Sequence, residues 1–325
     1  MMTTRFSNAL CLLLLLFSCP LLAADWKPTR PIEFVVGAAA GGSNDLFARS
    51  IAKVMVERKL VDVPVNVVNR AGGSGEIAFA HVAKQVGDPH YFVVVPFNLL
   101  TNHIMGRSQL SHQDYTPLAL LISEYTTVMV RSDSPIANGK DFVARLVQNP
   151  QALSISIGTG VANGPHIALA LAMKAGGVDV RKLKTVVFQS GGESNTAVLG
   201  GHVDAVSSSA ANAVSMAGKL RAVAISSLER QPGALSSIPT WREQGIDAYF
   251  DNWRGVAAPK GLTPEQTAFW DQTFTRLAQS EEWKKECERY EWVAAHRRSA
   301  AFRTQLDDEY KKVAASLSDL GLVKK

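Results

Sequence analysis

The sequence predicts an α/β protein of two lobes, each built on a mainly parallel β-sheet flanked by helices. Short apolar stretches that are typical of strands alternate with helical patterns along nearly the whole chain. About 300 residues follow an N-terminal export signal, which is too many for one simple core and suits two compact lobes. The alternation starts afresh after residues 132–135, so a second sheet is expected there.

The N-terminal segment has the features of an export signal. Arg5 gives it a charged start, residues 9–22 are an apolar run, and small residues follow at Ala23 and Ala24. We predict cleavage near Ala23 and Ala24 and a mature chain that acts outside the cytoplasm. The apolar run has about 14 residues, fewer than the roughly 20 that span a bilayer, and no later run is long enough.

An alternative for the N-terminus is lipidation at Cys19, because residues 16–19 loosely resemble the box before an acylated cysteine. Phe17 is bulky for that box, and the apolar run continues after Cys19, so ordinary cleavage is favoured. Removal of the signal leaves Cys287 as a single cysteine, and packing must then stabilise the fold without an internal disulfide.

The chain has a mildly basic composition. Its formal charge is +5, and loss of Arg5 with the signal leaves 33 basic and 29 acidic residues, a net charge of +4. This balance would assist the binding of an anion. The basic residues do not cluster as in a nucleic-acid-binding surface, so no nucleic acid partner is expected.

The first lobe should begin with two strand, glycine loop, helix units. A strand at residues 32–36 leads into the loop 37–42, and the next helix places Phe47, Ile51 and Val54 on one face. The second unit comprises a strand at 65–68, a turn at 69–75, a helix at 76–85 and a strand at 91–95.

The second lobe should repeat this plan. Its expected strands lie at residues 127–131, 153–157, 184–188, 205–206 and 220–225, with a helix at 165–174 and a short helix after the loop 189–193. A strand at 250–258 and helices at 264–279, 282–290 and 300–316 complete the chain.

No linker separates the two parts, so we expect two crossing strands near Thr127 and Trp253. The first lobe would then be discontinuous, with residues 25–128 and 251–325 in lobe 1 and residues 129–250 in lobe 2.

Four loops rich in small residues follow predicted strands, at the edge where open α/β sheets bind ligands. They span residues 39–43, 72–75, 158–163 and 190–194. Glycine lets the backbone approach a ligand, and each following helix presents unpaired N–H groups with a partial positive charge, which suits an oxyanion. The alternative for any one loop is a tight turn that only caps its helix.

Individual side chains in these loops also have two interpretations. Asp45 could cap the first helix, and Glu193 fits a capping box with Ser190. Thr159 and Asn163 could bind a carboxylate or make local turn bonds. Asp204 could hold its own loop in place or accept a hydrogen bond from a ligand ammonium or hydroxyl.

An enzyme is not predicted. Residues 73–78 match a dinucleotide pattern, but the next strand ends in residues 96–98 without the acid that would bind a ribose. Nucleophile-elbow, phosphate-loop and zinc-protease motifs do not occur, and the seven histidines lack metal-ligand spacing. We therefore predict no catalytic residue, no metal and no cofactor.

Taken together, the motifs resemble the extracytoplasmic solute receptors of tripartite tricarboxylate transporters, often called the Bug family. The resemblance spans nearly the whole mature chain. Its motifs are Arg30-Pro31-Ile32, Ala40-Gly41-Gly42-x-x-Asp45, Asn69-Arg70-Ala71-Gly72-Gly73, Gly160-x5-His166, residues 196–204, residues 218–222, Ile238-Pro239-Thr240 and Trp253-x-Gly255-Val256-x-Ala258-Pro259.

The resemblance implies a two-lobed type II periplasmic binding fold that closes about two hinge strands onto its ligand. Receptors of this family typically bind carboxylates through main-chain amides and small hydroxyl residues, often with ordered waters, rather than through an arginine clamp. Residues 39–43 and 159–163 would hold the first carboxylate, and residues 189–194 would form the far wall. Gly37-Ala38 replaces the usual Pro-Phe and Ala162-Asn163 the usual Gly-Ser, so the pocket should be wider on one side and more amide-lined on the other.

The expected function is that of a non-catalytic periplasmic receptor, acting as a monomer, that delivers a small organic carboxylate to a membrane permease. An exported enzyme and a ligand-presenting partner of a sensor kinase remain as alternatives. The candidate ligand-binding residues are Ala39, Ala40, Gly41, Gly42, Ser43, Asp45, Thr159, Gly160, Ala162, Asn163, Gln189, Ser190, Gly191, Glu193 and Asp204.

Overall fold

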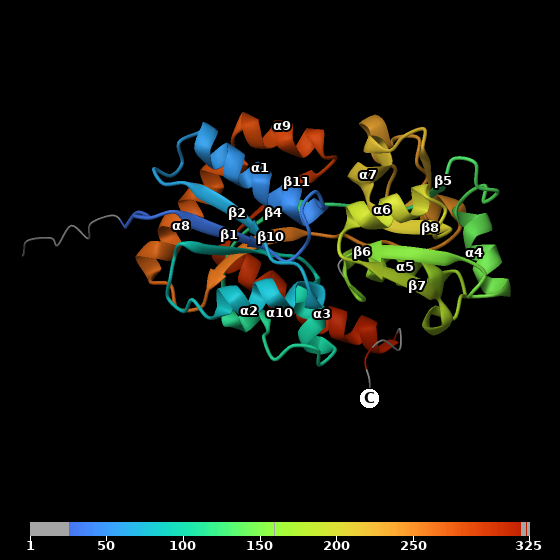
Figure 1. Ribbon diagram of the computed structural model, residues 1–325, viewed down its shortest axis with the longest axis horizontal. Helices are drawn as coiled ribbons and strands as arrows, with labels where there is room; N and C mark the ends of the chain where they lie inside the picture. The colour runs from blue at the N-terminus through green and yellow to red at the C-terminus, as the bar shows by residue number, and fades with distance from the viewer. Residues whose placement is uncertain (1–25, 159, 320–322, 324–325) are drawn as a thin grey trace, which may run out of the picture.

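The computed structural model describes residues 26–158, 160–319 and 323, which form two lobes, each around one β-sheet (Figure 1). The predicted two-lobed α/β fold is confirmed, although both sheets are mixed, with parallel strands on one side and antiparallel strands on the other. The predicted export signal, its cleavage near Ala23 and Ala24, and Cys19 lie outside the described residues.

The sheet of the first lobe has six strands in the order β11-β4-β10-β3-β1-β2. Three strands run parallel, and β10, β4 and β11 continue the sheet in antiparallel fashion. The strands are β1 (Ile32–Val36), β2 (Val65–Asn69), β3 (Tyr91–Val95), β4 (Tyr115–Ser123), β10 (Arg254–Pro259) and β11 (Val293–Arg298).

Helices cover both faces of this sheet because successive side chains of its central strands point to opposite sides. Phe34 contributes to the core beneath α1, α8 and α9, and Val35 to the core beneath α2, α3 and α10. The helices are α1 (Ser43–Glu57), α2 (Glu76–Ala83), α3 (Asn98–Ile104), α8 (Pro264–Ala278), α9 (Glu281–Arg289) and α10 (Ser299–Asp319).

The second lobe contains a five-stranded sheet in the order β7-β6-β8-β5-β9. Two helices, α4 and α5, pack on one face around Phe142 and Ile155, and α6 packs on the other face around Val206. The elements are β5 (Thr126–Arg131), α4 (Gly139–Gln148), β6 (Ser154–Gly158), α5 (Gly164–Ala175), β7 (Lys184–Phe188), α6 (Gly191–Leu199), β8 (Ala205–Ser209), α7 (Ala210–Ser215) and β9 (Leu220–Ile225).

The chain passes from the first sheet to the second between Ser123 and Thr126, and it returns to the first sheet at Arg254. The two crossing segments are joined by reciprocal backbone hydrogen bonds. Glu124 N donates to Asn252 O at 3.1 Å, and Asn252 N donates to Glu124 O at 2.9 Å. The predicted lobe boundaries at 128/129 and 250/251 stay a prediction. The first passage between the sheets lies a few residues before the boundary at 128/129.

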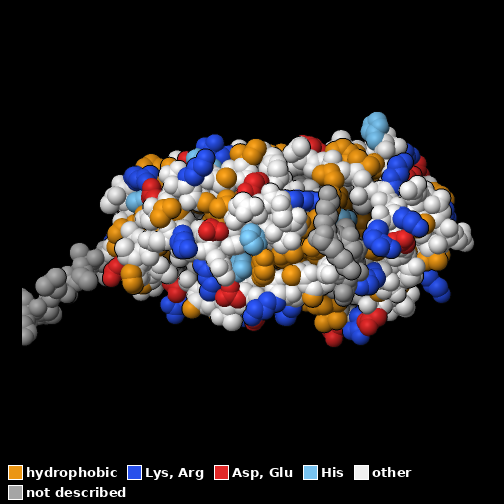
Figure 2. Space-filling view, turned by 90° about the horizontal axis from the view of Figure 1, so that it is seen from below, with side chains coloured by type: hydrophobic (Ala, Val, Ile, Leu, Met, Phe, Trp, Pro, Cys, Tyr) orange, Lys and Arg blue, Asp and Glu red, His pale blue; other side chains and the backbone are white. Residues whose placement is uncertain are grey.

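Several elements were not predicted. They are the strands β4 and β11 and the helices α3, α4 and α7. Strand β8 also continues three residues beyond the expected 205–206, through Ser207, Ser208 and Ser209, whose polar side chains gave no sign that they would be buried. None of the helices in the described ranges is both long and apolar enough to cross a bilayer. Figure 2 shows basic and acidic side chains interspersed over the face seen from below.

Candidate functional site

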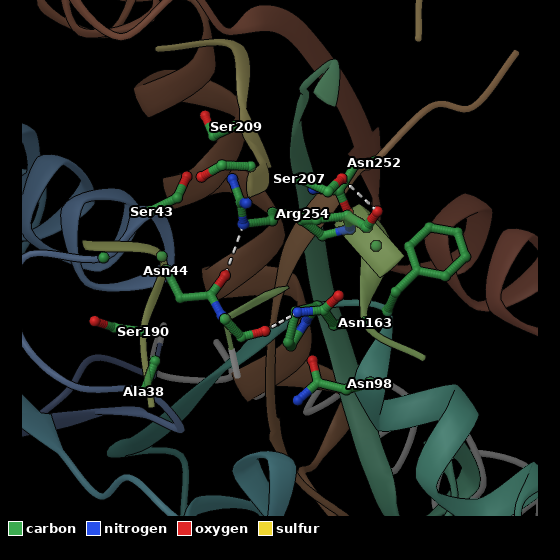
Figure 3. Close-up of a pocket in the computed structure, with 18 of the residues that line it drawn as sticks. Ala38, Ser43, Asn44, Asn98, Asn163, Ser190, Ser207, Ser209, Asn252 and Arg254 are labelled. Atoms are coloured by element: carbon green, nitrogen blue, oxygen red, sulfur yellow. Dashed lines mark hydrogen bonds between the residues drawn. The ribbon is translucent and has the colours of Figure 1, made fainter. Parts of the chain in front are cut away.

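A cavity lies between the lobes, at the carboxyl ends of the parallel strands of both sheets (Figure 3). This is the edge where ligands bind in open α/β sheets. The first lobe and the returning crossing segment contribute Ala38, Gly42, Ser43, Asn44, Pro96, Phe97, Asn98, Asn252 and Arg254. The second lobe contributes Gly158, Asn163, Gly164, Pro165, Ser190, Gly191, Ser207, Ser208, Ser209 and Asn212.

Five helices of the described chain begin at this cavity. The longer ones are α1 from the first lobe and α5 and α6 from the second, and the short helices α3 and α7 also begin at its lining. Asn163 caps α5 by accepting from His166 N at 2.8 Å, and Ser190 caps α6 by accepting from Glu193 N at 3.2 Å. Gly42 caps α1 and offers its first N–H groups no side-chain acceptor. Each helix start carries unsatisfied N–H groups and a partial positive charge, so the cavity favours an anion.

The lobes touch each other beside the cavity. Thr101 Oγ1 of the first lobe donates to Ala162 O of the second at 2.8 Å. A side chain on Gly160, whose φ is +119°, would lie 1.9 Å from Ser74 Oγ, so only glycine fits where the lobes meet. The structure therefore has a closed arrangement, in which a small solute would be enclosed.

Asp45 stabilises the glycine loop at residues 39–43 by hydrogen bonds and is absent from the described lining of the cavity. Its carboxylate accepts from Gly41 N at 2.9 Å, from Arg49 Nε at 2.8 Å and from Asn69 Nδ2 at 2.9 Å. Burial acts to raise the pKa of this carboxyl, but the hydrogen bonds from Arg49, Gly41 N–H and Asn69 outweigh burial, and the pKa is lowered.

The lowered pKa of Asp45 predicts a pH-dependent contribution to stability. A carboxyl of this kind stabilises the fold above its unfolded pKa, near the model-peptide value of 3.8, and the contribution is lost as the pH falls through the lower folded pKa. Asp45→Asn should lower the free energy of unfolding by about 1–2 kcal/mol at neutral pH, and this difference should shrink below pH 4.

Urea unfolding of both proteins between pH 7 and pH 3 measures that difference. Asp247→Asn is the control, because Asp247 is an exposed carboxylate that pairs with exposed Arg242. A difference for Asp45→Asn that stayed constant or grew toward pH 3 would contradict the proposed charge effect.

A buried carboxylate, that of Glu124, lies behind the cavity on the first crossing segment. Its side chain is 0% exposed and forms an ion pair with Arg254. Glu124 Oε1 also accepts from Ser43 Oγ of the first lobe at 3.0 Å and from Ser209 Oγ of the second, while Oε2 accepts from Asn252 Nδ2 at 3.4 Å. One carboxylate at the hinge thus joins both lobes and both crossing segments.

The structure brings five of the candidate residues together around the cavity: Gly42, Ser43, Asn163, Ser190 and Gly191. Gly41 lies in an adjoining hollow beside Tyr290. Thr159 lies outside the described residues. The other candidates, which are absent from the described lining of the cavity, are Ala39, Ala40, Asp45, Gly160, Ala162, Gln189, Glu193 and Asp204.

Two of these residues have evident local roles. Glu193 accepts a hydrogen bond from Gln189 N at 3.0 Å, as expected of a residue at a helix start. Asp204 accepts from Ser154 N at 2.7 Å and from Ser154 Oγ at 2.6 Å, at the amino ends of β6 and β8. The cavity lies at the carboxyl ends of those strands, so Asp204 is at the wrong edge of the sheet to contact its contents.

Ala162 and His166 shape the loop before α5. Ala162 has φ +63°, and its N–H donates to His166 Nδ1 at 2.8 Å. Burial and the nearby Arg107 lower the pKa of His166 to about 4, so the imidazole is neutral at neutral pH and accepts this hydrogen bond.

Among the lining residues that sequence reasoning missed are Asn98, the serines 207–209, Asn252 and Arg254. Asn98 comes three residues after the strand at 91–95 and begins α3, so its position near the carboxyl edge of the sheet was a usable signal. Arg254 lies in an otherwise apolar strand, and a charged residue in such a strand is itself a signal. No group of three or more metal-ligating side chains gathers within the part of the chain that the structure describes.

The comparisons with known proteins agree with this geometry. The family model described as "Tripartite tricarboxylate transporter family receptor" matches residues 47–309. The "UPF0065 protein in gbd 5'region" of Cupriavidus necator is 26% identical over 304 residues, which cover 93% of this chain and 90% of that protein.

Two solved structures have the same fold. MatC from Rhodopseudomonas palustris with bound malate is 23% identical, with a TM-score of 0.81 over 89% of this chain and 99% of that one. A second R. palustris protein, solved with adipate, is 22% identical, with a TM-score of 0.83 over 90% of this chain and 98% of that one.

Proposed function

The chain belongs to the tripartite tricarboxylate transporter receptor family, and from this premise we propose that it captures a small organic carboxylate between its lobes and delivers it to a membrane permease. The convergence of the N-termini of the three longer helices, α1 from the first lobe and α5 and α6 from the second, is the observation that supports this most directly. The similar receptors bind malate and adipate, which are both carboxylates.

Receptors of this family are periplasmic. We propose that this chain reaches the periplasm through the export signal that ends near Ala23 and Ala24 and that it performs no catalysis there. Its function as a monomer and a role in presenting ligand to a sensor kinase stay predictions.

Calorimetric titration of the purified chain tests the proposal. The panel contains malate, adipate, citrate, glutamate, an aromatic acid and glucose as a neutral sugar, and the protein is first unfolded and refolded to remove any co-purified ligand. At least one carboxylate should bind saturably. At 100 times its Kd it should stabilise the fold by about 2.7 kcal/mol and raise Tm by roughly 5–10 °C.

Saturable binding of glucose with no response to any acid would contradict carboxylate capture. The enzyme alternative is tested on the same samples by NMR after long incubation, because a receptor returns every added compound unchanged whereas an enzyme converts at least one.

A further inference from the structure

Arg254 differs from every other residue that lines the cavity. It is the one ionisable side chain in the described lining, and only 6% of that side chain is exposed. Taking a guanidinium out of water is costly unless its N–H groups find acceptors. The hydrogen-bond partners of each guanidinium nitrogen therefore show whether a solute in the cavity has to provide an acceptor.

Two of the three nitrogens have partners inside the protein. Arg254 Nε donates to Asn44 Oδ1 at 2.7 Å, and Nη2 forms the ion pair with Glu124 Oε2. Nη1 is buried and has no hydrogen-bond partner among the described residues. Figure 3 shows the Arg254 guanidinium between Asn44 and Ser209, among the side chains that line the cavity.

Glu124 is poorly placed to satisfy Nη1 as well. Its Oε1 accepts from Ser43 and Ser209, and its Oε2 accepts from Asn252 and from Nη2 of Arg254. Nε and Nη2 thus hold the arginine in place, and Nη1 remains a donor for which the described residues provide no acceptor.

We propose that Arg254 Nη1 donates a hydrogen bond directly to a carboxylate oxygen of the captured solute and so fixes that carboxylate at the hinge end of the cavity. This inference rests on the proposed function and adds a charged contact to recognition by backbone amides. Because Glu124 already neutralises much of the guanidinium charge, the contact acts mainly through a directed, charge-assisted hydrogen bond. Such a hydrogen bond is stronger to a carboxylate than to a hydroxyl or an amide, so the contact favours a carboxylate.

A pair of variants separates this contact from a purely structural role. Glu124→Gln removes the buried negative charge but leaves Arg254 in place, so its affinity for malate or adipate should stay within threefold of wild type or increase. Glu124→Gln with Arg254→Met removes both charges and leaves no lone buried ion. Relative to Glu124→Gln, this double variant should bind the same probe about 10- to 100-fold more weakly.

Two further variants complete the experiment. Glu124→Gln with Arg254→Lys keeps a cationic donor and should recover part of the lost affinity. Lys53→Met with Glu286→Gln removes an ion pair between half-exposed Lys53 of α1 and buried Glu286 of α9, whose Nζ to Oε1 distance is 2.6 Å. That control should bind as wild type does. Circular dichroism confirms that each protein is folded before titration.

The decisive quantity is the affinity ratio between Glu124→Gln and the Arg254→Met double variant, measured with malate or adipate. A ratio below threefold overturns the contact, including the case in which Glu124→Gln alone loses as much affinity as the double variant. A wild-type protein that binds no carboxylate overturns the proposed function itself, so the two failures are distinguishable.

Discussion

Gly42→Val is expected to weaken carboxylate binding by at least about 100-fold while the protein still folds. The backbone at Gly42 has φ −81° and ψ 166°, which any residue can adopt. A Cβ placed there would lie 3.5 Å from Ser190 Cβ and 3.9 Å from Gly191 N of the opposite lobe, which is ordinary contact. The γ carbons of valine reach roughly 1.5 Å further and would hold the lobes apart.

Gly42→Ala is the graded control for this prediction. Its single methyl group fits the space between Gly42 and Ser190, so affinity should fall by less than about tenfold. Titration gives the affinities, and urea unfolding should show a loss of about 1 kcal/mol or less for either variant. Near-normal affinity in Gly42→Val would mean that the solute is captured elsewhere.

The second large effect is expected from Glu124→Ala, which should lower the free energy of unfolding by about 3–5 kcal/mol. The substitution leaves the Arg254 guanidinium buried without its counterion and removes the acceptor of Ser43 and Ser209. For a chain of this size that loss corresponds to a fall in Tm of roughly 6–15 °C.

Thermal and urea unfolding measure this loss, with Asp133→Ala as the control. The Arg131 and Asp133 side chains form an ion pair while both are exposed, so its removal should leave the free energy of unfolding close to that of the wild type. If Glu124→Ala lowered the free energy of unfolding no more than Asp133→Ala, the buried Glu124–Arg254 pair would not contribute to the stability of the fold.

Much of the fold could be predicted because it depends on local patterns. Strands such as Ile32–Val36 alternate between two cores, and the glycine loop and amphipathic helix that follow indicate a repeated α/β unit. Strand β4 was missed although it lies between β10 and β11. Its residues are buried almost throughout, so they form a continuous apolar run without period-2 alternation.

The sequence predicted those parts of the candidate site that consist of loop backbone and helix starts. It did not predict the parts that depend on side chains far apart in the sequence. Gly42 and Ser190 were found because glycine and serine at a helix start have a local meaning. Glu124 and Arg254 are 130 positions apart, and each alone is only a charge in an apolar segment. Their pairing becomes evident when the two crossing segments lie side by side.

That side-by-side arrangement has a mechanical consequence. The two crossing segments are joined by the backbone hydrogen bonds between Glu124 and Asn252, so they would move together as one hinge. Rotation at that hinge would let the solute leave without changing the hydrogen bonds within either sheet. A permease that contacts the outer surfaces of the two lobes could therefore open the cavity and release the solute without contacting the cavity itself.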